Sequence, residues 1–279
     1  MTKLIRAGIK RMLKMRLLYV CFAIILFIDG FDMVKEYLTA ETKASLPSAD
    51  GYLMSGFLAI VILSAVFISS FIGSEHSFGT IRNKMTVGHK RLEIYFASFV
   101  VCEIGVMLMY ALVWLLTGAI GTLLLGWFTY STTDLLNRLI ASLLAFTMLT
   151  ALNVMIAFCI HSKSKSSVTA VIAAFIMMIS SVMTIQILSE PEFYSTETMT
   201  EETIQLFEPS DDDPSLVKNP NYVSGTKRRM YQIIHDYCPV TQMIDVLDKF
   251  GTKDVLIPSC EIIVLMAAGM VIFKKRDLK

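Results

Sequence analysis

The residues best suited to chemistry in this chain are four histidines and five cysteines, and none stands in a catalytic or metal-binding pattern. The histidines are His76, His89, His161 and His235, and the cysteines are Cys21, Cys102, Cys159, Cys238 and Cys260. No two have the spacing of a zinc site or a redox pair. The sequence also lacks a GxxxxGK[ST] phosphate loop, a GxSxG motif and an HExxH motif. We therefore expect no enzyme activity, no metal and no cofactor in this chain, and no nucleotide hydrolysis by it alone.

Three polar residues lie deep inside apolar stretches. Glu103 follows Arg91 by 12 residues, and Glu261 precedes Lys274 by 13, which puts each carboxyl ~18–20 Å along its helix. A charge at such a depth in a membrane costs about 2.5–3.5 kcal/mol on insertion scales. Together with Asn153 they are candidates for a substrate pathway. The alternatives are a protonated carboxyl bonded to a neighbouring helix and, for Asn153, an interhelical hydrogen bond.

The apolar stretches that hold these residues predict a membrane protein. The 279 residues are 54% hydrophobic and 18% charged, with a mean hydropathy of +0.60. The apolar residues cluster in runs long enough for membrane-spanning helices. The predicted fold class is an all-α integral membrane protein with one domain over residues 1–279 and six spans. The spans are 15–31, 52–72, 94–125, 135–160, 168–188 and 255–273.

Two of the predicted spans are irregular. The apolar part of the first is short, so the helix needs basic side chains that reach the membrane surface, or an extension past Asp29 and Asp32. The third is long enough to be kinked or tilted around Gly118 and Gly121.

Residues 2–14 predict an amphipathic helix before the first span. Ile5, Ile9, Met12 and Leu13 share one side, while Lys3, Arg6, Lys10, Arg11 and Lys14 occupy much of the rest. Such a helix lies in the membrane interface with its basic side toward anionic lipid headgroups. A simple basic anchor before the first span is the alternative.

The distribution of basic residues predicts the orientation, although the net charge is only +1. With the N-terminus inside, the inner segments hold the bases of residues 2–16 and then Arg82, Lys84, Lys90, Arg91, Lys163, Lys165, Lys274, Lys275, Arg276 and Lys279. The short outer loops hold Lys35, Lys43 and Arg138. Under the positive-inside rule, both termini are cytoplasmic.

The predicted outer segment covers residues 189–254. Its first part, 190–213, is acidic and poor in apolar residues, and prolines interrupt it. Further on, Cys238-Pro239 can open a helix, and Val240, Met243, Ile244, Leu247 and Phe250 recur at helical spacing. We expect an amphipathic helix that lies on the outer membrane face or caps the bundle. A disulfide between Cys238 and Cys260 is conceivable but cannot be established from spacing.

The loop 73–91, between the second and third spans, reads GSEHSFGTIRNKMTVGHKR. We expect Gly73 to end the span and Ser77 to cap a short helix that ends near Gly88. Phe78, Ile81 and Met85 would form one apolar stripe with basic residues beside it. Such a helix suits a groove of another protein. The alternative is that the stripe lies on the bilayer and the bases hold headgroups.

The pattern E-x-x-x-G-T-I-R-N-K followed by G-x-x-R resembles the same loop of bacterial ABC type-2 exporter permeases. In that family the loop carries the coupling helix, which sits on a separate ATP-binding subunit. The resemblance implies an ATPase-docking role for Glu75, Phe78, Gly79, Ile81, Arg82, Asn83, Lys84 and Arg91. It also implies two cytoplasmic ATPase subunits that bind ATP and Mg²⁺, a second permease protomer, and the bacterial cytoplasmic membrane with its lipids. We expect no nucleic-acid partner.

The predicted function is that of the permease subunit of an ATP-driven ABC exporter for a peptide, a lipophilic compound or a drug. One alternative is an antimicrobial-peptide sensing or immunity component that uses the acidic outer segment. Another is an ATP-independent carrier or scaffold. A carrier would depend on Glu103 and Glu261, whereas an ATP-driven exporter would depend on the loop 73–91.

Overall fold

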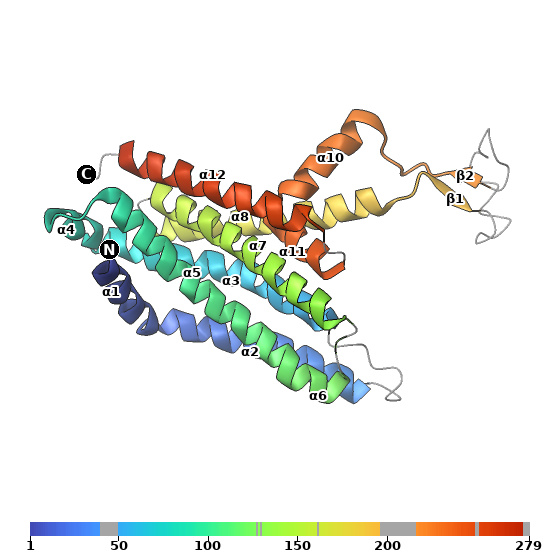
Figure 1. Cartoon of the computed structure of the whole chain (residues 1–279), viewed down its shortest axis with the longest axis horizontal. Coiled ribbons are helices and arrows are strands. Elements are labelled where there is room, and N and C mark those ends of the chain that lie inside the picture. The colour runs from blue at the N-terminus through green and yellow to red at the C-terminus, as the bar shows by residue number, and fades with distance from the viewer. Residues whose placement is uncertain are drawn as a thin grey trace.

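A computed structural model describes residues 1–39, 50–126, 128, 130–160, 162–195, 216–248 and 251–275. Its six long apolar helices are each able to cross a membrane by length and composition (Figure 1). They are α2 (Arg16–Thr39), α3 (Asp50–Ser77), α5 (Arg91–Leu116) with its continuation, α7 (Thr132–Cys159), α8 (Lys163–Ser189) and α12 (Lys253–Lys275). The predicted all-helical fold with six long apolar helices is confirmed.

The two ends of the bundle differ. Met1, the end of α12 and the short helix α4 (Thr80–Thr86) lie at one end, here called the basic end (Figure 1). The strands β1 (Phe193–Ser195) and β2 (Leu216–Lys218) extend from the other, here called the ribbon end. Both ends of the described chain therefore lie at the same end of the bundle (Figure 1). The cytoplasmic location of both termini stays a prediction.

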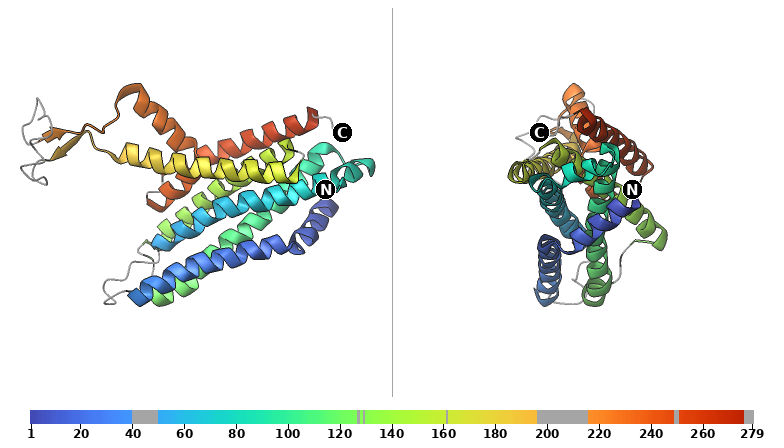
Figure 2. Two further views of the ribbon diagram at one scale, coloured as in Figure 1. Left: turned by 180° about the vertical axis from the view of Figure 1, so that it is seen from behind. Right: turned by 90° about the vertical axis from the view of Figure 1, so that its left-hand side faces the viewer.

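Helix α3 is the centre of the bundle. It lies between α2 and α8 (Figure 2) and also packs on α5 and α7. Gly105 of α5 permits this packing, because a Cβ atom there would lie 2.5 Å from the Phe67 ring of α3. Most residues in the apolar windows of α2, α8 and α12 are only partly buried or exposed in the single chain. These three helices therefore offer apolar faces to lipid or to another membrane protein.

The first span is longer than 15–31, because α2 continues past Asp29 and Asp32 to Thr39. Its 24 residues correspond to ~36 Å, enough to cross a bilayer. Asp29 is fully buried, and its Oδ1 atom accepts a hydrogen bond of 3.4 Å from the Ser55 hydroxyl. A Cβ atom at Gly56 would lie 2.6 Å from Asp29 Oδ2. A glycine on α3 thus makes room for this carboxyl.

The third span contains the predicted irregularity. Helix α5 passes into a π-helical turn, η2 (Thr117–Gly121), and then into α6 (Thr122–Leu125). A π-helical turn shifts the hydrogen-bond ladder by one residue and changes the direction of the following side chains. The two glycines that predicted a kink, Gly118 and Gly121, lie in this turn.

Helix α1 (Thr2–Leu13) is present and joined to the bundle. Met12 is fully buried, and Ile5 and Ile9 are partly buried against the core. Gly8 permits a close approach to α5, since a Cβ atom there would lie 2.7 Å from a Val101 methyl group. Lys3, Arg6 and Lys10 are exposed. The predicted amphipathic helix is therefore packed through its apolar side.

The strands β1 and β2 form a small ribbon that the sequence did not predict. They pair antiparallel, with Phe193 opposite Lys218 and Tyr194 opposite Val217. Tyr194 Oη and Asn219 Nδ2 donate hydrogen bonds of 2.5 and 2.9 Å to Glu190 Oε2. The ribbon is thereby anchored to the end of α8. Most of the acidic stretch 190–213 lies outside the described residues, so its proposed sensing role stays a prediction.

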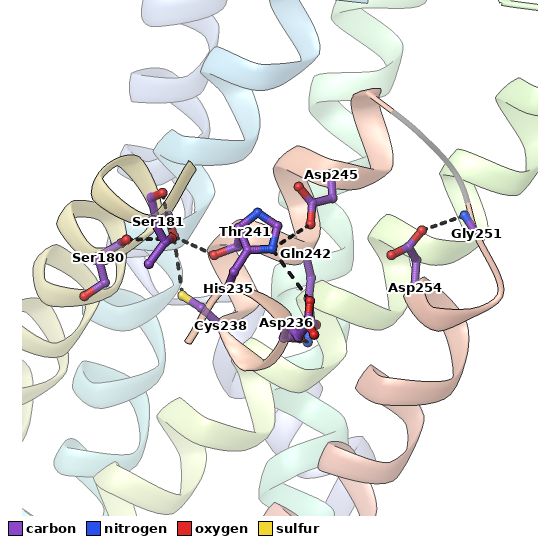
Figure 3. A network of polar contacts seen from close by, with 11 residues as sticks. Ser180, Ser181, His235, Asp236, Cys238, Thr241, Gln242, Asp245, Gly251 and Asp254 are labelled. Carbon is purple, nitrogen blue, oxygen red and sulfur yellow. Dashed lines mark hydrogen bonds and ion pairs between the residues drawn. The ribbon is translucent and has the colours of Figure 1, made fainter. Parts of the chain in front are cut away.

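Two further helices follow the ribbon, α10 (Gly225–Tyr237) and α11 (Pro239–Asp248). Pro239 opens α11 as predicted, and Val240, Met243 and Val246 are buried. Because α11 packs on α3, α7, α8 and α12, it caps the bundle. The Ser181 hydroxyl of α8 lies 3.1 Å from Thr241 Oγ1 and 3.4 Å from Cys238 Sγ (Figure 3). Cys238 is buried, Cys260 is exposed, and both are free thiols.

Candidate docking loop and polar membrane residues

The loop 73–91, at the basic end, has helix boundaries that differ from the predicted ones. Helix α3 continues through Gly73 to Ser77, so Gly73 does not end the span and Ser77 does not cap α4. Gly73 instead lies against α8, where a Cβ atom would be 2.8 Å from Lys163 Cα. The chain reverses at Gly79, which precedes α4 with a φ of 63°. Such a φ favours glycine because other side chains are strained there. The predicted end of the helix near Gly88, with a φ of 98°, is confirmed.

Glu75 is the polar centre of this loop. Its side chain is 3% exposed, and its Oε1 atom accepts hydrogen bonds from Arg11 Nη1 at 2.6 Å and from Lys84 Nζ at 2.5 Å. The Arg11 guanidinium also lies 3.9 Å over the Phe71 ring and donates to the Phe71 carbonyl. Charge-assisted hydrogen bonds compensate a buried carboxylate. One carboxylate thus ties α1, α3 and α4 together.

The predicted apolar stripe does not form. Ile81 is buried and Met85 is partly buried against the bundle core. Phe78 precedes the reversal at Gly79, lies outside α4 and is 79% exposed. Helical spacing therefore does not apply to it. The exposed side chains form a surface that we call the docking face: Phe78, Arg82, Asn83, Thr86 and Val87.

Arg91 begins α5 and holds the loop against α12. Its Nη1 atom donates to the carbonyl oxygens of Phe273 at 3.4 Å and Lys274 at 3.2 Å. The last carbonyls of a helix have no partner within the helix, and a basic side chain can satisfy them. Of the eight predicted docking residues, Phe78, Arg82 and Asn83 are thus on the docking face. Glu75, Gly79, Ile81, Lys84 and Arg91 shape or brace the loop.

The three predicted pathway residues do not meet. Glu103 of α5 accepts a hydrogen bond of 2.7 Å from Thr147 Oγ1 of α7. Glu261 of α12 accepts one of 2.9 Å from Gln242 Nε2 of α11. Asn153 of α7 is buried, and its amide has no hydrogen-bond partner among the described residues. Glu103 and Glu261 therefore belong to two different helix contacts, and the predicted interhelical hydrogen bond of Asn153 is not seen among the described residues.

Two buried ionisable residues were not among the predicted site residues. Asp29 appeared only as an interruption of the first apolar run. Arg138 had been counted as an outer-loop base, but it is buried, stacks 3.8 Å over the Tyr130 ring and donates to the Val246 carbonyl. A charged residue inside an apolar run was the available signal for both. Within the described part of the chain, no group of three His, Cys, Asp or Glu side chains could hold a metal ion.

Comparison with known families agrees with this architecture. A sequence model described as "ABC-2 family transporter protein" matches residues 4–181, more than half of the chain. The match runs from α1 through the docking loop and into α8. No curated protein matches the chain. Because the family match extends over α1, the loop and most of the long apolar helices, this chain belongs to the ABC-2 family of membrane-spanning transporter permeases.

Proposed function

We propose that this chain is the membrane subunit of an ATP-driven exporter in the bacterial cytoplasmic membrane, with its basic end in the cytoplasm. Separate ATPase subunits, which bind ATP and Mg²⁺, would dock there. The orientation is supported by the basic residues gathered at that end, since inner segments are enriched in lysine and arginine. They include Lys3, Arg6, Lys10, Arg82, Lys84, Lys90, Arg91 and Lys274.

The observation that carries the proposal is the docking face on a braced loop. Phe78, Arg82, Asn83 and Val87 are exposed, while Glu75 binds Arg11 and Lys84 beneath them. A rigid element with exposed apolar and basic side chains suits a groove of a partner protein. Since the loop joins α3 to α5, a push on α4 would move the central helix of the bundle.

A complete transporter on this scheme contains two ATPase subunits and two permease protomers. The exposed apolar faces of α2, α8 and α12 leave room for a second protomer, which is either another copy or a related chain. Cargo would cross between the protomers. A peptide, a lipophilic compound or a drug is the proposed cargo class.

Co-purification of a phosphate-loop ATPase with the tagged full-length chain tests the proposal. Mass spectrometry identifies the ATPase, and nucleotide hydrolysis by the purified complex confirms that it is active. Arg82→Glu, which reverses a charge on the docking face, should abolish recovery, and Phe78→Ala should reduce it. Lys218→Glu is the matched control, because Lys218 is an exposed base at the ribbon end. Equal ATPase recovery with Arg82→Glu and with the control would refute the docking role.

A further inference from the structure

A hollow of about 530 Å³ lies among α7, α8, α10, α11 and α12. Its walls are mainly apolar and include Met148, Leu152, Ile176, Ile233 and Leu265. Methionine side chains, of which Met148 is one, adapt to ligands of different shapes. An open apolar hollow of this size can hold one face of a compact organic molecule.

One carboxylate, that of Glu261, lines this apolar hollow. Its Oε2 atom accepts a hydrogen bond from Gln242 Nε2, which also donates to the Asp236 carbonyl, both at 2.9 Å. These two bonds fix the Gln242 amide and leave its buried Oε1 acceptor without a partner. Among the described residues, no lysine, arginine or histidine forms an ion pair with Glu261. The polar side of the hollow therefore carries a carboxyl group that has no basic partner among the described residues.

A second hollow, of about 290 Å³, adjoins the same glutamine. Its lining includes Asp236, Asp245, Asp254 and the two basic residues His235 and Lys253. His235 Nδ1 lies 3.4 Å from Asp245 Oδ2 and 3.8 Å from Asp236 Oδ1 (Figure 3). The three carboxyl groups of this lining outnumber its two basic side chains. The charges on both sides of Gln242 thus favour a cation over an anion.

We propose that the larger hollow binds a lipophilic cation, with its apolar body against α7 and α8 and its charge near Glu261. The inference rests on the proposed exporter function, for which it names the cargo class. An anion would be repelled by Glu261, and a lipid acyl chain would gain nothing from a carboxylate. A lipophilic cation can contact both the apolar wall and the Glu261 carboxyl. The Tyr237 ring in the wall can add a cation–π contribution.

Tetraphenylphosphonium and tetraphenylborate test the proposal, because they have nearly the same shape and opposite charges. Binding is measured by equilibrium dialysis with the purified full-length chain in lipid nanodiscs, with empty nanodiscs as the blank. We expect saturable binding of the phosphonium. Glu261→Gln should weaken its affinity about tenfold, the change expected for loss of one charged partner. The variant glutamine can still accept the hydrogen bond from Gln242, and Glu192→Gln, at an exposed carboxylate, is the control.

Three results would overturn the inference: no saturable phosphonium binding, equal affinity of the parent chain and Glu261→Gln, or equal affinity for the phosphonium and the borate. Leu265→Trp, which fills the hollow, should also remove phosphonium binding, and retained binding would place the ligand elsewhere. Since no ATPase is needed in this assay, its failure is distinct from failure of ATPase docking. A transporter with a working docking face and no cation site would retain the proposed function and lose only this cargo class.

Discussion

Lys84 Nζ lies 2.5 Å from Glu75 Oε1, and this contact joins the short helix α4 to α3, the central helix of the bundle. Arg11 shares the same oxygen. The loop is therefore fixed from two sides, by α1 and by α3. A partner that pushed on the docking face would meet a braced element, and its displacement would reach α3.

Neutralising Glu75 should loosen this brace. Glu75→Gln keeps the shape of the side chain but leaves Arg11 and Lys84 without their negative partner. We expect a loss of about 1–3 kcal/mol of stability, observed as a lower unfolding temperature and faster hydrogen exchange in α4. Glu93→Gln is the control, since the Glu93 side chain is 38% exposed and lies 3.6 Å from His89 Nδ1. Equal unfolding temperatures for the two variants would show that the contacts of Glu75 with Arg11 and Lys84 do not stabilise the loop.

Arg91 should hold the C-terminal turn of α12. Arg91→Met removes the donor to the Phe273 and Lys274 carbonyls while it keeps most of the side-chain length. Hydrogen exchange measured by mass spectrometry should rise in the last turn of α12, because its carbonyls lose their partner. Lys90→Met changes an exposed base one residue earlier. If both variants left α12 exchange unchanged, the contact would have no structural role.

Gly105 should resist enlargement. In Gly105→Ala the new methyl group meets the Phe67 ring in the middle of the bundle, and such overpacking costs typically about 1–3 kcal/mol. Gly118→Ala provides the comparison, because nothing lies within 4 Å of a Cβ atom there. Thermal unfolding in detergent should separate the two variants. A Gly105→Ala protein as stable as Gly118→Ala would show that α3 and α5 do not pack in this way.

The ribbon should respond to acid. Hydrogen bonds from Tyr194 and then Asn219 lower the pKa of Glu190 below its ordinary value of 4.5. A group with a lowered folded-state pKa stabilises the fold above its unfolded pKa, and this contribution is lost as pH falls through the folded value. Rate-corrected hydrogen exchange in residues 193–195 and 216–218 should therefore increase as pH falls below 4.5. Glu190→Gln should remove most of this pH dependence, and an unchanged profile in the variant would rule out Glu190 as its cause.

The sequence predicted the features that a membrane imposes on every helix. Long apolar runs located all six spans, and Gly118 and Gly121 located the irregular turn. Prediction from the sequence failed where the conformation of a segment depends on contacts with residues far along the chain. The spacing of Phe78, Ile81 and Met85 suggested one stripe, but the reversal at Gly79 separates Phe78 from the others. The ribbon was not predicted, because its two short strands are separated by a long acidic stretch.

The same reason explains the incomplete prediction of the site. The pattern around Arg82 and Asn83 identified the loop, but it could not distinguish exposed residues from bracing ones. Glu75 becomes a brace only because α1 brings Arg11 to it. The polar membrane residues were recognisable as unusual, yet their separate partners, Thr147 and Gln242, depend on how α7 and α11 pack.

The central claim is that the docking face lies in the cytoplasm, where an ATPase can bind it. The most direct test places a cysteine at Asn83 in a chain whose five native cysteines are replaced, and labels intact cells with a membrane-impermeant maleimide. Thr133→Cys, an exposed position at the start of α7 on the opposite end, is the control. The account predicts labelling of Thr133→Cys in intact cells and labelling of Asn83→Cys only after the membrane is opened. Labelling of Asn83→Cys in intact cells would contradict it.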